Sequence, residues 1–196
     1  KKSEYKIEFS EYKVKVDDIL DINVDVEIGD AAIMFNDELQ PTNTKEAVQI
    51  SGYQVNSQGY IFFPSIGEIY VLGKSLELIR KNIEKLIIEK GLLTKPTINI
   101  KLVNSYFVII GEVNLPGRYD FLKNNLNILE AIGIAGDLTI NGQRNNVKII
   151  RNINNQASIN TIDLTSDEIF NNDNFQIFSG DIIVVNQNST RVKNAG

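Results

Sequence analysis

Residues 108–137 constrain the fold of this chain more than any other segment. An apolar, β-branched run ends at Gly111, a pattern typical of a buried strand that stops at a turn. Pro116-Gly117 then predicts a tight turn, because Pro presets φ at one position and Gly takes positive φ at the next. A second strand is predicted over residues 119–122.

A short helix completes this compact unit. Asn127 is a candidate N-cap, and Glu130 stands at the capping-box spacing behind it. Apolar residues follow at helical spacing, and Gly133 or Gly136 can end the helix. The segment therefore predicts strand, turn, strand and helix in that order.

Strand patterns dominate the part of the chain before this unit. Apolar residues alternate with polar ones over residues 12–16 and again over residues 20–26, which predicts two half-buried strands. Residues 53–63 are predicted to form a hairpin that is closed by Pro64 and Gly67.

One longer helix is predicted over residues 76–90. Ser75 is its candidate N-cap and Gly91 its stop signal, and charged residues separate the apolar positions. Further strands are predicted where apolar alternation returns, at residues 98–102, 147–150, 158–164 and 182–185. A short helix is predicted over residues 165–170.

Composition excludes several classes of function. The 196 residues contain neither Cys nor His, so disulfides, thiolate chemistry and His-based metal sites are excluded. The net charge of −5 disfavours nucleic acid as a partner, because phosphate binding needs clustered Lys and Arg. No apolar run is long enough for a transmembrane helix.

Four stretches together resemble the outer-membrane polysaccharide export proteins of the Wza type. Residues 12–24 are similar to the opening of the export domain, and residues 58–67 are similar to its Gly-x-Ile-x-x-Pro-x-Ile-Gly motif. Residues 111–136, with Gly-Glu-Val-x-x-Pro-Gly-x-Tyr, Leu-Glu-Ala-Ile and Ala-Gly, look like the SLBB module, a β-grasp domain. Residues 180–185 are similar to the closing strand of that module.

The resemblance implies an α+β chain with two domains. A small mixed-sheet polysaccharide-export domain is expected over residues 12–104 and a β-grasp SLBB domain over residues 105–187. An N-terminal tether over residues 1–11 and a C-terminal tail over residues 188–196 flank them. The residues that carry the family motifs are expected to be structural: Asp18, Gly59, Pro64, Gly67, Gly111, Pro116, Gly117, Gly136, Gly180 and Asp181.

The resemblance also implies a function. The chain is expected to be the periplasmic part of an outer-membrane translocon for capsule or exopolysaccharide, with no catalytic residues, no metal and no cofactor. It implies a lipid anchor on a cysteine upstream of Lys1, a homo-oligomeric ring around the polymer, and an inner-membrane polysaccharide co-polymerase or tyrosine kinase as partner. Without the membrane-crossing helix of the family, the isolated chain is expected to be monomeric.

Several residues could form a binding site or could have a purely structural role. Asp17, Asp18, Asp21 and Asp25 could hold a cation, but a solvated strand face is the favoured interpretation. The aromatic residues of 60–63 could stack on sugars, although a place in the core is favoured for all of them. Tyr53 and Tyr70 are the tentative sugar contacts.

Two other functions remain open from sequence. The first is an SLBB-type module for a small soluble ligand or sugar, which needs a pocket between sheet and helix near Tyr119 and Leu129. The second is a carbohydrate-active enzyme, which needs two carboxylates facing each other across a cleft.

Overall fold

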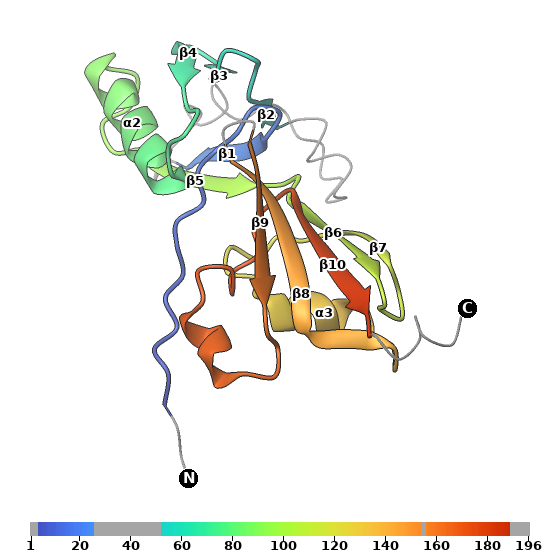
Figure 1. Ribbon diagram of the computed structural model, residues 1–196. Coiled ribbons are helices and arrows are strands. Elements are labelled where there is room, and N and C mark those ends of the chain that lie inside the picture. Colours follow the sequence, from blue (N-terminus) through green and yellow to red (C-terminus); the bar gives the residue numbers. More distant parts are fainter. Residues whose placement is uncertain (1–3, 26–51, 154–155, 189–196) are drawn as a thin grey trace. The chain divides into compact units, whose positions relative to one another are not determined.

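The computed structural model describes residues 4–25, 52–153 and 156–188 (Figure 1). Its strands and few helices confirm the predicted α+β class. The predicted C-terminal tail, residues 188–196, lies outside the described residues except for Asn188.

The chain divides into two compact units. Glu11–Asn104 form the first unit, and Ser105–Gly196 together with Lys1–Ser10 form the second unit. Each unit has its own cluster of buried apolar side chains, so each one buries a core of its own.

The first unit contains a three-stranded antiparallel sheet, a separate hairpin and a helix. The sheet has the order β2-β1-β5, with β2 at Tyr53–Gln54, β1 at Ile19–Asp25 and β5 at Thr97–Leu102. The hairpin pairs β3 (Tyr60–Phe63) with β4 (Gly67–Tyr70). In β1 the apolar residues at alternating positions are buried, as the predicted strand pattern requires.

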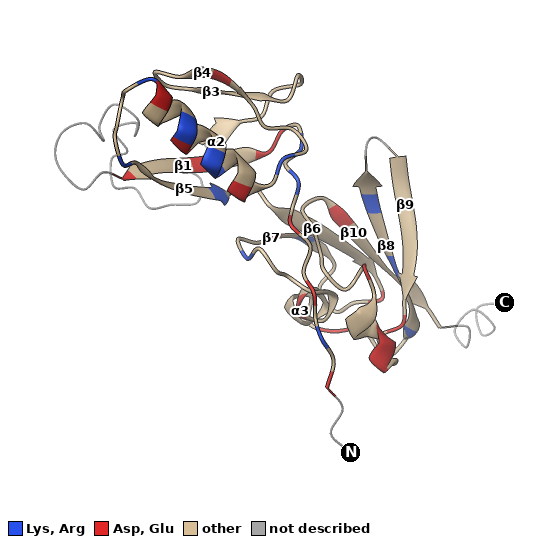
Figure 2. Cartoon of the chain, turned by 90° about the vertical axis from the view of Figure 1, so that its left-hand side faces the viewer, with Lys and Arg blue, Asp and Glu red and all other residues tan. Residues whose placement is uncertain are grey.

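Helix α2 (Leu76–Glu89) follows its predicted signals at both ends. The side chain of Ser75 accepts from the N–H of Leu78, and Gly91 takes a φ of +67° just past the last turn. One face carries buried isoleucines, while Glu, Lys and Arg alternate on the exposed side (Figure 2). The helix therefore lies with an apolar stripe on the core and a solvated charged face.

Two strand predictions in this unit are wrong. Residues 12–16 form no strand, because Val14 exchanges only two backbone hydrogen bonds, one with Gly73 and one with Lys74, which is too few for a ladder. The hairpin predicted over residues 53–63 is displaced: β2 pairs with β1 instead, and β3 pairs with β4 across the turn behind Pro64.

The second unit is a five-stranded mixed sheet with a helix on its core side (Figure 1). The order is β7-β6-β10-β8-β9, and only β6 and β10 pair in parallel among the described ladders. The elements are β6 (Tyr106–Gly111), β7 (Gly117–Asp120), α3 (Ile128–Ile134), β8 (Gly142–Ile153), β9 (Gln156–Ile162), the 3-10 helix η2 (Asp167–Asn171) and β10 (Asp181–Gln187).

Helix α3 confirms the predicted capping box. Asn127 accepts from the N–H of Glu130, and the Glu130 carboxylate accepts from the N–H of Asn127. Gly136 stands just past the C-cap residue Ala135, and its φ of +73° allows the N–H of Asp137 to reach the carbonyl of Ile132. Distant residues complete both ends: the N–H of Ile128 donates to the carbonyl of Phe175 at 2.8 Å, and the carbonyl of Ala135 accepts from the N–H of Leu115 at 2.9 Å.

The Pro116-Gly117 prediction fails in its detail. Gly117 begins β7 and is not among the glycines with positive φ. The glycine that the fold requires is Gly111, with a φ of +93° at the end of β6. A Cβ at Gly111 would lie 2.1 Å from the carbonyl oxygen of Val185, so the close approach of β10 excludes any side chain there.

The N-terminal segment packs on the second unit. The ring of Tyr5 stacks on Phe170, with 5.4 Å between ring centroids. The buried side-chain amide of Gln176 accepts from the N–H of Ser10 at 2.7 Å and donates to the carbonyl of Ser10 at 3.1 Å. The segment predicted as a tether therefore makes backbone and ring contacts up to Ser10.

Strand β1 begins at a turn held by a buried aspartate. The carboxylate of Asp18 accepts from the N–H of Lys15 at 2.8 Å, and the N–H of Asp18 donates to the carbonyl of Lys15 at 3.4 Å. Asp17 between them has a φ of +68°. The carboxylate thus satisfies a backbone donor that the turn would otherwise leave without a partner.

Strand β10 begins at a turn of the same design. The carboxylate of Asp181 accepts from the N–H of Phe178 at 2.9 Å, the N–H of Asp181 donates to the carbonyl of Phe178 at 3.1 Å, and Gly180 has a φ of +88°. We call these two turns, residues 15–18 and 178–181, the strand-start turns.

Arg151 neutralises the carboxylate of the second strand-start turn. Its guanidinium makes two hydrogen bonds to Asp181, at 2.9 and 2.7 Å, and a third to the carbonyl of Gln176 at 2.8 Å. Asp181 is completely buried, so the pair is a desolvated, bidentate ion pair. The guanidinium also lies 4.4 Å from the ring centroid of Phe178.

Gly111→Ala is expected to lower the free energy of unfolding by at least ~2 kcal/mol, because the new Cβ meets Val185 and φ is positive. The measurement is urea unfolding followed by circular dichroism. The matched control is Gly133→Ala inside α3, where a Cβ meets no atom within 4 Å. The free energy of unfolding of this control should rise by ~0.5–1 kcal/mol. Equal effects of the two variants would contradict the conclusion that the fold requires glycine at position 111.

Arg151→Ala is expected to cost about 4 kcal/mol in the same assay, because Asp181 would remain buried without its cation. The control is Arg144→Ala, which breaks an exposed pair with Asp137 at 2.7 Å and should cost at most about 1 kcal/mol. Similar losses of unfolding free energy in both variants would show that the buried ion pair at Asp181 contributes no more to stability than the exposed pair does.

Candidate functional site

The two buried carboxylates of the described residues are engaged in structural contacts. Asp18 is 6% exposed and also accepts from the hydroxyl of Tyr12 at 3.0 Å. Burial raises the pKa of Asp18, and the hydrogen bonds from Lys15 and Tyr12 oppose this rise. Asp181 is bound by Arg151 on both oxygens. Since both face backbone donors within their own turns, neither is placed to exchange protons with a substrate.

The acidic face of β1 is held by amide side chains. Asn23 donates to Asp21 at 3.0 Å, and Asn99 on the neighbouring β5 donates to Asp25 at 2.9 Å. No group of three acidic side chains within the described ranges comes close enough to hold a metal ion. The arrangement is that of a polar strand face with one hydrogen bond along β1 and one across to β5.

The motif residues of the first unit shape the hairpin β3–β4. Gly59 has a φ of +87°, and a Cβ there would lie 2.6 Å from the Cβ of Leu72. Its carbonyl accepts from the N–H groups of Val71 and Leu72, at 2.8 and 3.1 Å. The carbonyl of Pro64 accepts from Ile66 at 2.7 Å inside the turn, and Gly67, with a φ of +99°, opens β4.

The motif residues of the second unit lie at strand and helix ends. Gly111 ends β6, Pro116 stands directly before β7 and Gly117 opens it, while Gly136 follows α3 and Gly180 precedes β10. Each of these five positions lies where an element begins or ends, and none of the five carries a reactive side chain.

The two tentative sugar contacts lie in different surroundings. Tyr53 is half-buried and its ring packs on Phe63 of the first core, with 5.1 Å between centroids. Tyr70 is 41% exposed and lies edge-on to Tyr60, with centroids 5.1 Å apart. Tyr70 is therefore the more accessible of the two rings.

Phe62 was predicted to be core, and this prediction is wrong. Phe63 is fully buried, whereas Phe62 is 71% exposed. The two residues are neighbours in β3 and point to opposite faces of the strand. Sequence reasoning missed Phe62 because alternation identifies two faces but does not say which one meets the core.

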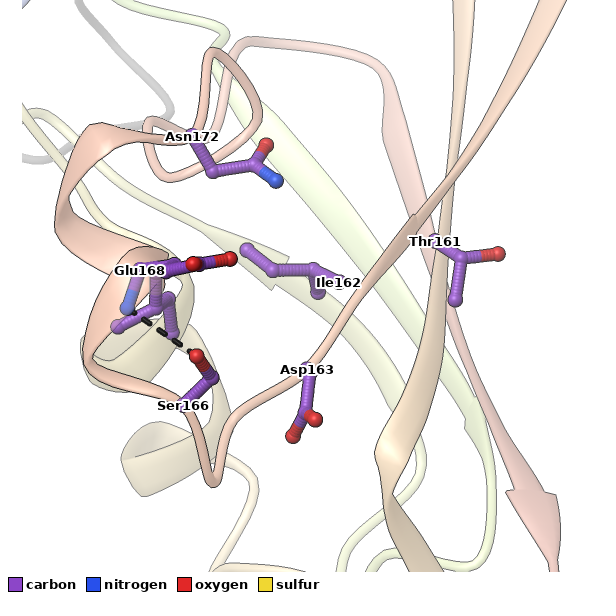
Figure 3. Close-up of a pocket in the computed structure, with 7 residues that line it drawn as sticks. Thr161, Ile162, Asp163, Ser166, Glu168 and Asn172 are labelled. Atoms are coloured by element: carbon purple, nitrogen blue, oxygen red, sulfur yellow. Dashed lines mark hydrogen bonds between the residues drawn. The ribbon is translucent and has the colours of Figure 1, made fainter.

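A polar pocket of about 230 Å³ opens between β9 and η2 in the second unit (Figure 3). Asp163 and Glu168 contribute carboxyl groups to its wall, and the N–H of Glu168 donates to Ser166 at 3.2 Å. Hydrogen bonds from Thr165 lower the pKa of Asp163. A general acid needs a raised pKa, so Asp163 is not poised to act as the general acid of glycoside cleavage. The lining residues are Thr161, Ile162, Asp163, Ser166, Glu168, Ile169 and Asn172.

The space expected to hold a small ligand between sheet and helix is occupied by protein. The ring of Tyr119 stacks on Phe107, with centroids 5.4 Å apart, and its hydroxyl donates to the carbonyl of Leu115 at 2.6 Å. Leu129 is 41% exposed and faces away from the core. This packing counts against a ligand pocket at that position.

None of the helices in the described part of the chain has the length and hydropathy that a bilayer crossing requires.

Comparison with known proteins matches both units. Residues 8–103 match the family model described as polysaccharide biosynthesis/export protein, and residues 105–185 match the SLBB domain model. The EPS I polysaccharide export outer membrane protein EpsA of Ralstonia nicotianae (strain ATCC BAA-1114 / GMI1000) is 30% identical over 107 residues. That stretch is 54% of this chain and only 28% of the relative. The chain belongs to the polysaccharide biosynthesis/export protein family and carries an SLBB domain directly after its export domain.

Proposed function

We propose that this chain is a non-enzymatic component of a translocon that carries capsular polysaccharide or exopolysaccharide across the outer membrane. The observation that carries the proposal is the order of the two matched domains, export domain and then SLBB domain, over residues 8–185. The similarity to a relative named as an outer membrane export protein supports a place at the periplasmic face of that membrane.

The chemistry of the described residues supports a conduit in preference to a catalyst. The chain has no His and no Cys, and its buried carboxylates are bound within the strand-start turns. A conduit for a long polymer needs weak, repeated contacts, because strong binding at any one point would stall the chain. Exposed amide and hydroxyl groups meet that requirement.

The assembly we propose is a ring of identical chains around the polymer. Such a ring needs a head-to-tail interface whose rotation closes on itself. In this proposal the full-length protein is anchored through a lipidated cysteine upstream of Lys1, and an inner-membrane polysaccharide co-polymerase or tyrosine kinase delivers the polymer. This assembly follows from the family resemblance.

Deleting the gene tests this function. Surface polysaccharide is expected to fall at least tenfold while polymer accumulates inside the cell envelope, because synthesis continues when export stops. Carbohydrate is quantified separately in the washed surface fraction and in the envelope lysate.

Complementation supplies the control for folding. The Arg144→Ala gene should restore surface polysaccharide fully, and the Arg151→Ala gene should restore less of it, because its product is unstable. Unchanged surface polysaccharide in the deletion strain would refute an export role. Loss of polymer from both fractions would point to synthesis instead.

A further inference from the structure

The outward face of the hairpin β3–β4 is rich in aromatic side chains. Ile61 and Phe63 of β3 and Ile69 of β4 enter the core, which leaves the alternate positions on the other face. Phe62 is 71% exposed and Tyr70 is 41% exposed, and Tyr60 is half-buried beside Tyr70. We call Tyr60, Phe62 and Tyr70 the aromatic face.

Neighbouring contacts hold the two tyrosines of this face in place. Tyr60 and Tyr70 are directly opposite each other across the ladder and meet edge to face at an interplanar angle of 67°. Lys74 donates to the carbonyl of Tyr70 at 2.8 Å, and its ammonium lies 5.4 Å from the centre of that ring. Little side-chain entropy is therefore left to lose when a ligand binds at Tyr70.

Phe62 is the most exposed residue of this face. Its partner across the ladder is Glu68, which is also exposed. A single exposed apolar residue is ordinary, but three aromatic residues gathered on one short hairpin form a patch of the kind that marks a binding surface.

We propose that the aromatic face stacks a sugar ring of the exported polysaccharide, with Phe62 as its main platform. This inference rests on the proposed export function. One face of a pyranose ring is lined with C–H bonds of partial positive charge, which complement the negative face of an aromatic ring. The hydroxyl groups at the sugar's edge find hydrogen-bond partners in Glu68 and Lys74.

The size and polarity of the face favour a sugar over a protein partner. A stable protein interface buries about 800 Å² on each partner, far more than a few side chains of one hairpin supply. Charged Glu68 lies directly beside Phe62, whereas charged residues are depleted at the centre of protein interfaces. Both properties fit a ring-sized ligand with a polar rim.

A tryptophan at Phe62 tests the proposal directly. The chain contains no Trp, so Phe62→Trp places a single fluorophore on the aromatic face. The probe is the surface polysaccharide of the organism that carries the gene, purified and cut into short oligosaccharides. As oligosaccharide is added, the tryptophan emission of Phe62→Trp is expected to shift to the blue until the shift saturates. The control is Ile140→Trp, at a position 94% exposed in the second unit, whose emission should not change.

Substitutions then separate stacking from other effects. Phe62→Ser is expected to weaken binding of the same oligosaccharides roughly tenfold in isothermal titration, and Phe62→Tyr should restore it. In the deletion strain, the Phe62→Ser gene should restore less surface polysaccharide than the Phe62→Tyr gene.

The opposite outcomes overturn the proposal without touching the export function. If the deletion strain loses surface polysaccharide but Phe62→Ser restores it fully and leaves oligosaccharide binding unchanged, the aromatic face is not a sugar site. An emission shift of Phe62→Trp that follows protein concentration and ignores the oligosaccharides would identify a contact between copies of this chain instead.

Discussion

Both units of this chain depend on a buried aspartate at the first residues of a core strand. Asp18 and Asp181 each accept from a backbone N–H three residues earlier, and a residue of positive φ precedes each of them. Because β1 and β10 both pair on two sides, an error at these turns would shift the register of two ladders at once. A buried carboxylate is costly, and here the cost is offset by hydrogen bonds and, at Asp181, by Arg151.

The features that the sequence predicts correctly are those whose causes are local. The capping box of Asn127 and Glu130 and the N-cap at Ser75 each involve residues within four positions of one another, so a pattern can specify them. The family resemblance also predicts the order of the two domains correctly, because four weak motifs that occur in the expected order support one another.

The features that the sequence misses depend on distant partners. Gly111, and not Gly117, takes positive φ, and the carbonyl of Val185, far along the chain, leaves no room for a Cβ at Gly111. Phe63 takes its expected place in the core and Phe62 does not, because successive residues of β3 face opposite sides and only one side meets the core. Tyr70 was expected from the sequence as a tentative sugar contact and stays a prediction, whereas the exposure of Phe62 was not predicted.

The proposed function is that this chain guides a polymer and leaves its bonds intact, and the family match supports the export role. The most direct measurement of that claim is photo-crosslinking in living cells, with a photoreactive phenylalanine in place of Phe62. The account predicts a polydisperse adduct that stains for carbohydrate and that disappears in a strain unable to make the polymer. An adduct of fixed mass that contains only protein, and that persists without polymer, would contradict it.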